Sequence, residues 1–197
     1  MQSNHKSTTK FWRIYPAKLL SMLGVISLLS LTGCNEAPAP VAKRLNLQLT
    51  PASLGATISI QQHLKVEREN KTDDLDAALE IDAERLELVG LAFGQRVLSV
   101  NFDGKEIKTW RHFMLPQQVR AEDVLEDIQL SLWPAEVIAQ HLPAPWRITE
   151  NGLERALYQG DTLITKIRYS EASRWAGTVV LENLHYKYRL TIQTAKE

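Results

Sequence analysis

The sequence has few of the features on which enzymes and metal proteins depend. Its 197 residues include a single cysteine, which excludes an internal disulfide and a cluster of cysteine metal ligands. It contains no HExxH spacing, no GxSxG motif and no glycine-rich phosphate loop. Basic and acidic residues number 23 each, so there is no basic excess of the kind that nucleic acid attracts. We therefore predict no enzymatic activity, no metal or cofactor, and no nucleic-acid partner.

Long hydrophobic runs are also absent, and a short one lies near the N-terminus. Leu19–Leu31 is uncharged, but its thirteen residues fall short of the about 20 that a membrane-spanning helix needs. The residues before it include no acidic side chain and four basic ones: Lys6, Lys10, Arg13 and Lys18. A basic segment followed by a short apolar core is typical of a secretory signal peptide. The alternative is a permanent N-terminal membrane helix.

The lone cysteine directly follows this run, in the sequence Leu31-Thr32-Gly33-Cys34. The quartet resembles the bacterial lipobox, in which a branched apolar residue and two small residues precede a cysteine. The resemblance implies that residues 1–33 are removed, and that Cys34 receives a diacylglycerol thioether and becomes an acylated N-terminus. Two or three acyl chains anchor a protein stably, whereas one chain does not. The alternative is an ordinary signal peptide beside a free cysteine.

The rest of the chain divides into a tether and a domain. Asn35 is not the aspartate associated with inner-membrane retention in enteric-type bacteria, which implies the periplasmic face of the outer membrane. Residues 34–52 are rich in proline and polar side chains, and we expect the lipidated cysteine and a flexible tether there. Residues 53–197 then form a single β-rich domain that is large enough for a hydrophobic core.

Most of that domain shows the two-residue alternation of half-buried strands. Leu98, Val100 and Phe102 alternate with polar residues, and Asp103-Gly104 predicts a hairpin turn after them. Similar alternation predicts strands near residues 58–67, 75–82, 86–93, 163–169, 175–181 and 186–192. At Gly90 the apolar parity changes, which suggests a bulge or a sharp bend. The strands follow one another too closely for helical crossovers, so we expect them to pair antiparallel.

The middle of the domain has helical periodicity instead. Apolar residues recur at helical spacing over residues 121–132, and Pro134 begins a second short helix. An alternating strand over residues 127–133 is the alternative. Together these elements predict a mainly β fold of about ten strands. The strands form a curved antiparallel sheet, a half-open β-barrel, with the two short helices inserted mid-chain as a lid.

The concave side of such a sheet is either a packed core or a ligand cavity, and the sequence leaves both open. The candidates for a cavity wall face inward by parity: Ile60, Leu64, Leu79, Leu98, Val100, Phe102, Trp175 and Tyr188. Arg96 shares the parity of Leu98, so we predict that it points inward. There it forms a structural salt bridge or holds an anionic head group. Asp123, Glu126 and Asp127 are predicted to form a solvated helix face, with a catalytic pair of carboxylates as the alternative.

Four stretches carry a resemblance to a known family: LVGLAFGQRVLSVNFDG (88–104), DIQLSLWP (127–134), LPAPWRI (142–148) and WAGTVVLEN (175–183). Over roughly residues 60–195 the sequence resembles an uncharacterised lipoprotein family, whose genes often lie in aryl polyene biosynthesis clusters of Gram-negative bacteria. That family is distantly similar to the lipoprotein carriers LolA and LolB. The resemblance implies a half-open barrel with an apolar interior, and it implies an acyl chain, a lipoprotein or an aryl polyene lipid as cargo. It implies no catalytic residue.

We therefore predict an outer-membrane-anchored periplasmic lipoprotein that binds or transfers a hydrophobic, lipid-like cargo in its barrel. Its partners would be membrane lipid, through the acyl anchor, and the hydrophobic ligand. The alternative is a non-enzymatic structural lipoprotein with a packed barrel that docks onto an envelope protein complex. An accessory enzyme of polyene assembly is the third possibility, and it lacks supporting motifs.

Overall fold

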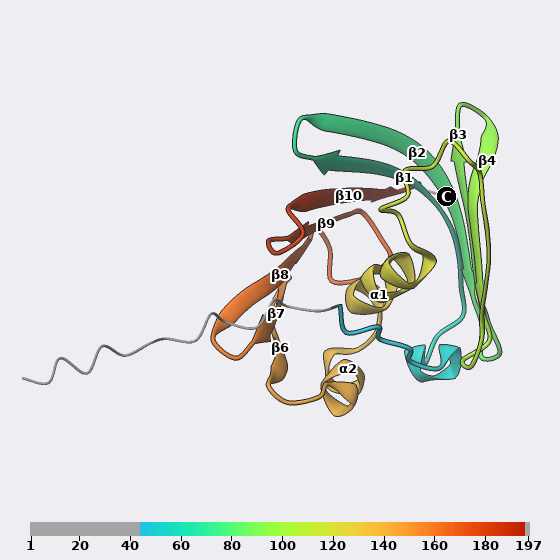
Figure 1. The fold of residues 1–197 in the computed structure, drawn as a ribbon. Coiled ribbons are helices and arrows are strands. Elements are labelled where there is room, and N and C mark those ends of the chain that lie inside the picture. The colour runs from blue at the N-terminus through green and yellow to red at the C-terminus, as the bar shows by residue number, and fades with distance from the viewer. Residues whose placement is uncertain (1–43, 196–197) are drawn as a thin grey trace, which may run out of the picture. The chain divides into compact units, whose positions relative to one another are not determined.

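The computed structural model describes residues 44–195, which fold around one curved antiparallel sheet of ten strands (Figure 1). The strands are β1 (Ile58–Arg68), β2 (Lys71–Ile81), β3 (Leu86–Ala92), β4 (Gln95–Phe102), β5 (Ile107–Arg111), β6 (Trp146–Asn151), β7 (Glu154–Gln159), β8 (Thr162–Tyr169), β9 (Thr178–Asn183) and β10 (Tyr188–Thr194). A 3-10 turn, η1 (Pro51–Leu54), precedes them. The helices α1 (Ala121–Leu132) and α2 (Ala135–His141) lie between β5 and β6.

Two meanders make up the sheet, whose strand order is β5-β4-β3-β2-β1-β10-β9-β8-β7-β6. Within each meander, consecutive strands pair with each other. The meanders join where β1 pairs with β10, from Gln62 opposite Thr194 to Arg68 opposite Tyr188. This pairing links the start and the end of the domain, so the two halves share one sheet.

The predicted fold is confirmed, because the sheet is antiparallel and curved and does not close. β5 and β6 end the strand order and each pairs on one side only. The space between these two edges is spanned by residues 44–54, α1 and α2, which we call the covering layer (Figure 1). The alternative of a strand over residues 127–133 is wrong, since α1 runs through Leu132 and buries residues at helical spacing.

The concave face is packed rather than empty. Leu125 and Leu130 of the covering layer are fully buried, as are Trp133 between its two helices and Phe102 and Leu181 from the sheet. They belong to one hydrophobic cluster, which also includes two leucines that precede η1, Leu47 and Leu49. Burial on this scale is the main stabilising contribution to a domain of this size.

The N-terminal boundary of the domain differs from the prediction. Leu47, Leu49 and Pro51 are buried, so residues 44–52 belong to the domain and are not part of a flexible tether. Their leucines alternate with exposed residues and pack under α1. The signal peptide, the lipobox with Cys34 and the tether up to residue 43 lie outside the described residues. Within residues 44–195, no helix has the length and apolarity to cross a membrane.

Candidate functional site

The eight predicted cavity residues come together on the concave side. Four of them, Leu79, Leu98, Val100 and Phe102, are buried members of the hydrophobic core. The other four are half-buried and pack against that core: Ile60, Leu64, Trp175 and Tyr188. They share this face with the covering layer. Their contact with a cargo stays a prediction.

Arg96 does not point into the concave side, and the prediction that it does is wrong. The β3–β4 register shifts between Gly90 and Leu91, so that Leu91 lies opposite Arg96 and Val97 has no partner on β3. A bulge of this kind moves the side chains beyond it to the other face. Arg96 is exposed, with its guanidinium carbon 4.3 Å from the ring centre of Trp110. The irregularity predicted at Gly90 is confirmed, and it is the reason that Arg96 faces outward.

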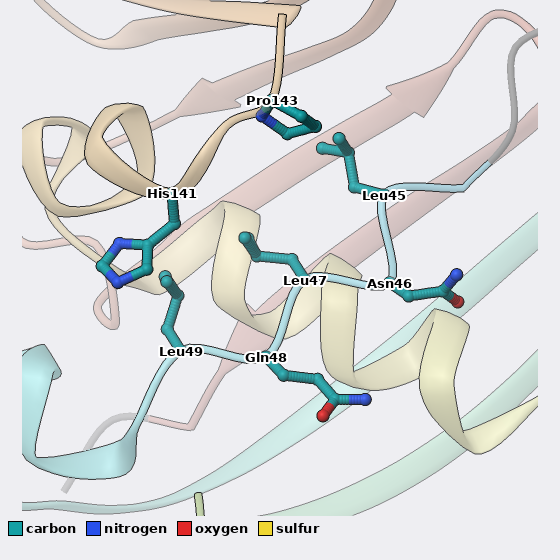
Figure 2. Close-up of a pocket in the computed structure, with 7 residues that line it drawn as sticks. All are labelled: Leu45, Asn46, Leu47, Gln48, Leu49, His141 and Pro143. Carbon is teal, nitrogen blue, oxygen red and sulfur yellow. The ribbon is translucent and has the colours of Figure 1, made fainter.

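A cleft of about 190 Å³ opens where the N-terminal segment meets the end of α2. In Figure 2 the side chains of Leu45, Leu47 and Leu49 point toward His141 and Pro143, and Asn46 and Gln48 point away from them. This cleft is the seam between two parts of the covering layer. Leu45 is the half-buried leucine of this cleft, and Leu47 and Leu49 form its buried floor.

Side chains of α1 hold the N-terminal segment in place. The amide of Gln129, which is completely buried, accepts a hydrogen bond from the Leu49 N–H at 3.0 Å and donates one to the Leu49 carbonyl at 2.8 Å. The Asn46 N–H donates to Glu126 Oε2 at 2.8 Å. Each bond satisfies a polar group of the segment that would otherwise lose its water partners. The segment is therefore attached to α1 by side-chain contacts and not by a strand ladder.

A second set of contacts surrounds Arg44, and we call Arg44, Asp123, Glu126, Asp127 and Tyr188 the Arg44 cluster. The Arg44 guanidinium donates to Asp127 Oδ1 at 2.9 Å and to the Tyr188 hydroxyl at 2.8 Å. It also lies 3.5 Å from a Glu126 oxygen and 3.7 Å from an Asp123 oxygen. The Tyr188 hydroxyl donates to Asp127 at 2.6 Å. Three carboxylates thus share one guanidinium.

The predicted solvated acidic face is wrong, because these carboxylates are largely buried. Glu126 is 4% exposed and the Asp127 side chain 12% exposed. Burial raises the pKa of Glu126, Arg44 opposes the rise, and the nearby charge of Asp127 adds to it. Burial also raises the pKa of Asp127, although Arg44 and the hydrogen bond from Tyr188 oppose it. The cluster therefore has an excess of negative charge that protonation relieves.

The other end of α1 is held by β7 and β8. Arg155, 1% exposed, donates to the Leu130 carbonyl and to Glu150, and the Tyr169 hydroxyl donates to the Ser131 carbonyl at 2.7 Å. The last carbonyls of a helix lack partners within it, so these two side chains act as its cap. We call Arg155, Glu150, Arg174 and Tyr169 the Arg155 cluster. Burial raises the pKa of Tyr169 to about 12, so its hydroxyl remains a donor at neutral pH.

A second cleft, of about 340 Å³, lies across the ends of β1, β9 and β10 and has a charged lining. Arg189 there stands 3.9 Å from a Glu67 oxygen and 3.8 Å from a Glu182 oxygen. Such ion pairs suit an apolar chain poorly, because burying them against it removes their water. The seam differs from this cleft in that three leucines and no carboxylate line it.

The residues that fix the covering layer were missed by sequence reasoning. Arg44 lay in the predicted tether, and its partner Asp127 is 83 positions away. Gln129 stands among apolar residues on the inner face of α1, so its position was the available signal for a buried polar role. Arg155 carried no such signal, since it follows a turn and its partners come from the tertiary fold.

Three comparisons place the chain among known proteins. A family model described as a protein of unknown function, DUF3261, matches residues 59–196. A search of curated proteins gave no significant match. Among solved structures, a DUF1329 family protein from Desulfovibrio piger is similar at 10% identity, over 74% of this chain and 87% of that chain. The TM-score of that alignment is 0.34, so it carries no argument about function.

Proposed function

The chain belongs to the DUF3261 family of proteins of unknown function, and we propose that it is a lipoprotein that binds or transfers a hydrophobic, lipid-like cargo. One observation carries the proposal: the apolar concave face of the sheet is covered by a layer that no strand pairing joins to the sheet within residues 44–195. Side chains such as Arg155, Tyr169 and Tyr188 make the polar links instead. Such a layer can move without breaking the backbone ladder of the sheet.

In this proposal the cargo replaces part of the covering layer. The seam of about 190 Å³ is smaller than the about 300–1,000 Å³ of typical ligand pockets. Loading therefore requires residues 44–50 and the first turns of α1 to move away from the inner face. An acyl chain or an aryl polyene lipid would then contact Leu79, Leu98 and Phe102, gaining about 25 cal/mol per Å² of buried apolar area.

The position of the seam supports a link to a membrane anchor. Leu45 lies at the start of the described residues, and Cys34, the predicted lipid attachment site, precedes Arg44 by ten positions. Ten residues span at most about 35 Å. With Cys34 acylated in the outer membrane, the seam would be held near the periplasmic surface of that membrane. Cargo would then have a short route between the bilayer and the domain.

The first experiment is mass spectrometry of residues 35–197, purified from the native host and extracted with organic solvent. We expect a stoichiometric lipid or polyene. A purified protein that contains no bound lipid or polyene and that does not bind fluorescent fatty-acid probes would contradict the proposal. The matched variants lie on the same segment: Leu45→Asp, which places a charge in the seam, should reduce probe uptake, and Gln48→Asp on the opposite side should leave it unchanged.

The packed interior favours a second candidate, a non-enzymatic structural lipoprotein of a cell-envelope complex. Trp133 and Leu125 are completely buried in the core on the concave side, and the strands β5 and β6 each present a free edge for docking. This candidate predicts that the covering layer stays in place. A chemical crosslink other than a disulfide, joining residues 44–50 to α1, would leave the docking of a structural lipoprotein intact. The same crosslink would abolish lipid uptake by a carrier.

A further inference from the structure

Two turns at one end of the sheet carry large apolar side chains at their tips. Phe93 and Gly94 form the two-residue turn between β3 and β4, both at positive φ, and Phe93 is 99% exposed. Asn-Gly and Asp-Gly are the usual residues of such a turn, because a bulky side chain there is strained. Phe93 gains no contact that offsets this strain, which indicates a role outside the folded domain.

The second turn follows β5 and lies beside the first. Phe113 and Met114, 89% and 69% exposed, occupy its two central positions, since the Leu115 N–H donates to the His112 carbonyl at 3.0 Å. The His112 N–H donates to the Val97 carbonyl of β4 at 2.9 Å, which fixes this turn next to the β3–β4 hairpin. Turn tips normally carry small or polar residues. Two neighbouring turns therefore both carry exposed apolar side chains where small or polar residues are usual.

A cationic and an aromatic side chain, Arg96 and Trp110, lie between the two turns. Because of the bulge at Val97, Arg96 faces outward and stacks over Trp110, which is itself 41% exposed. The guanidinium of Arg111 donates to the Leu115 and Pro116 carbonyls and so supports the second turn. We call the connected surface the tip patch; it consists of Leu91, Phe93, Arg96, Trp110, Phe113 and Met114.

The segments around the two turns carry basic side chains and no acidic ones. No acidic residue occurs in residues 88–102 or 107–121, and neither Arg96 nor Arg111 forms an ion pair with a carboxylate in the part of the chain that the structure describes. On the neighbouring strand β2, Asp76 lies opposite Leu91, and Asp74 and Asp76 contact His63 at 3.5 and 3.0 Å. The turn at the opposite end of β4 and β5 carries Asp103 and Glu106 instead.

We propose that the tip patch inserts into the interfacial region of a lipid bilayer that contains anionic head groups. Protruding Phe and Met side chains would enter the acyl boundary, with Trp110 behind them and Arg96 at the phosphates, which is the order that interfacial anchors follow. A protein partner fits this surface less well, because protein interfaces are broad and complementary in shape, whereas these side chains stand on two turn tips. The inference goes beyond the proposed function and does not depend on cargo or on Cys34.

The experiment measures how close each end of the sheet lies to lipid in the full-length protein. A fluorophore is attached to Gln95→Cys at the β3–β4 tip, or to Lys105→Cys at the opposite end, in protein reconstituted into vesicles with a head-group quencher. The chain without an introduced cysteine measures any labelling at Cys34. We expect several-fold stronger quenching at position 95 than at 105, and stronger quenching in mixed phosphatidylcholine and phosphatidylglycerol than in phosphatidylcholine alone.

Variants separate insertion from simple proximity. The pair Phe113→Ser and Met114→Ser, both at exposed positions, should reduce the quenching at position 95 to the level seen at 105. Leu153→Ser, an exposed leucine at the β6–β7 turn, should leave it unchanged. Equal quenching at both ends, or quenching at position 95 that survives the double substitution, would overturn the proposal. Shielding of position 95 only when envelope proteins are added would overturn it in favour of a protein partner.

Discussion

The two ends of α1 are held by arginines in opposite electrostatic settings. At the C-terminal end, Arg155 and Arg174 share one carboxylate, Glu150. At the other end, Arg44 faces three carboxylates on α1, including Glu126 and Asp127. Positive charge near a helix C-terminus and negative charge near its N-terminus both match the helix dipole. The partners differ in origin: Arg155 belongs to the sheet, whereas Arg44 belongs to the segment that leads back toward Cys34.

This difference shows how the covering layer can open. The Arg155 end is bonded to strands β7 and β8, which stay in place as long as the sheet persists. The Arg44 end depends on residues 44–50, which are attached by side chains alone. If α1 moves to admit cargo, we expect it to pivot on its C-terminal end and to release at its N-terminal end. The predictions below test each end in turn.

Loss of the C-terminal anchor should have the largest effect. Arg155→Met removes the cap of α1 and leaves Glu150 without its buried partner, which typically costs about 3–5 kcal/mol. Urea unfolding followed by circular dichroism measures the change. Arg174→Met is the control, because Arg174 bonds the same carboxylate from a more exposed position and should cost at most about 1 kcal/mol. Equal losses of unfolding free energy for the two variants would mean that Arg155 does not anchor the C-terminal end of α1.

Loss of the N-terminal anchor should cost less. Arg44→Gln leaves three carboxylates close together, and we expect a loss of roughly 2 kcal/mol at neutral pH, less than for Arg155 because the Arg44 side chain is partly exposed to water. The loss should shrink on acidification, because the carboxyls of Glu126 and Asp127 take up protons readily. Arg120→Gln, at an exposed ion pair with Glu122, is the control. A larger loss for Arg44→Gln than for Arg155→Met would reverse the assignment of the two ends.

Loss of the two hydrogen bonds between Gln129 and Leu49 should lower stability less than either arginine substitution and should make the covering layer open more readily. Gln129→Leu leaves the Leu49 N–H and carbonyl without partners, at about 1–2 kcal/mol. Hydrogen exchange at the Leu49 amide should accelerate, and uptake of a fatty-acid probe should rise. Gln140→Leu on the exposed side of α2 is the matched control. Unchanged exchange at Leu49 would show that the segment is held by its leucines alone.

The sequence predicted the fold well because burial has a period that can be read locally. Alternation identified Leu98, Val100 and Phe102, and helical spacing identified α1 almost to the residue. The β1–β10 pairing was beyond such reasoning, since partners such as Gln62 and Thr194 are far apart in the chain.

The site was less accessible for the same reason. Parity placed Arg96 on the wrong face because the bulge at Val97 turns the side chains beyond it to the opposite face of the sheet. Charge spacing within α1 suggested a solvated face, because Arg44 and Tyr188, which contact its carboxylates, come from the two ends of the domain. Contacts made by the tertiary fold therefore decided the roles of these polar residues.

The smallest effect is a difference in the sign of the pH dependence at the two ends of α1. Burial raises the pKa of Glu126 above its usual value near 4.5, with Arg44 opposing the rise. The folded state therefore binds more protons than the unfolded state, and the free energy of unfolding increases as the pH falls from neutral through that raised pKa. Burial would also raise the pKa of Glu150, but hydrogen bonds from Arg174 and Arg155 outweigh it and hold that pKa below its usual value. The stabilising contribution of the ionised Glu150 is present above about pH 4.5 and is lost as the pH falls through the lowered pKa.

Two isosteric variants separate these contributions. Glu126→Gln resembles the protonated state, so at neutral pH it should leave stability unchanged or raise it, and its advantage over the natural chain should vanish on acidification. Glu150→Gln removes the carboxylate that pairs with two arginines, so it should lower the free energy of unfolding at neutral pH. The difference from the natural chain should become smaller at the most acidic pH values. Urea unfolding at a series of pH values measures both. Parallel curves for the two variants would mean that the ends of α1 respond alike to protons. In that case acidification would not selectively stabilise the Arg44 end, and pH would not change how readily that end of the covering layer opens.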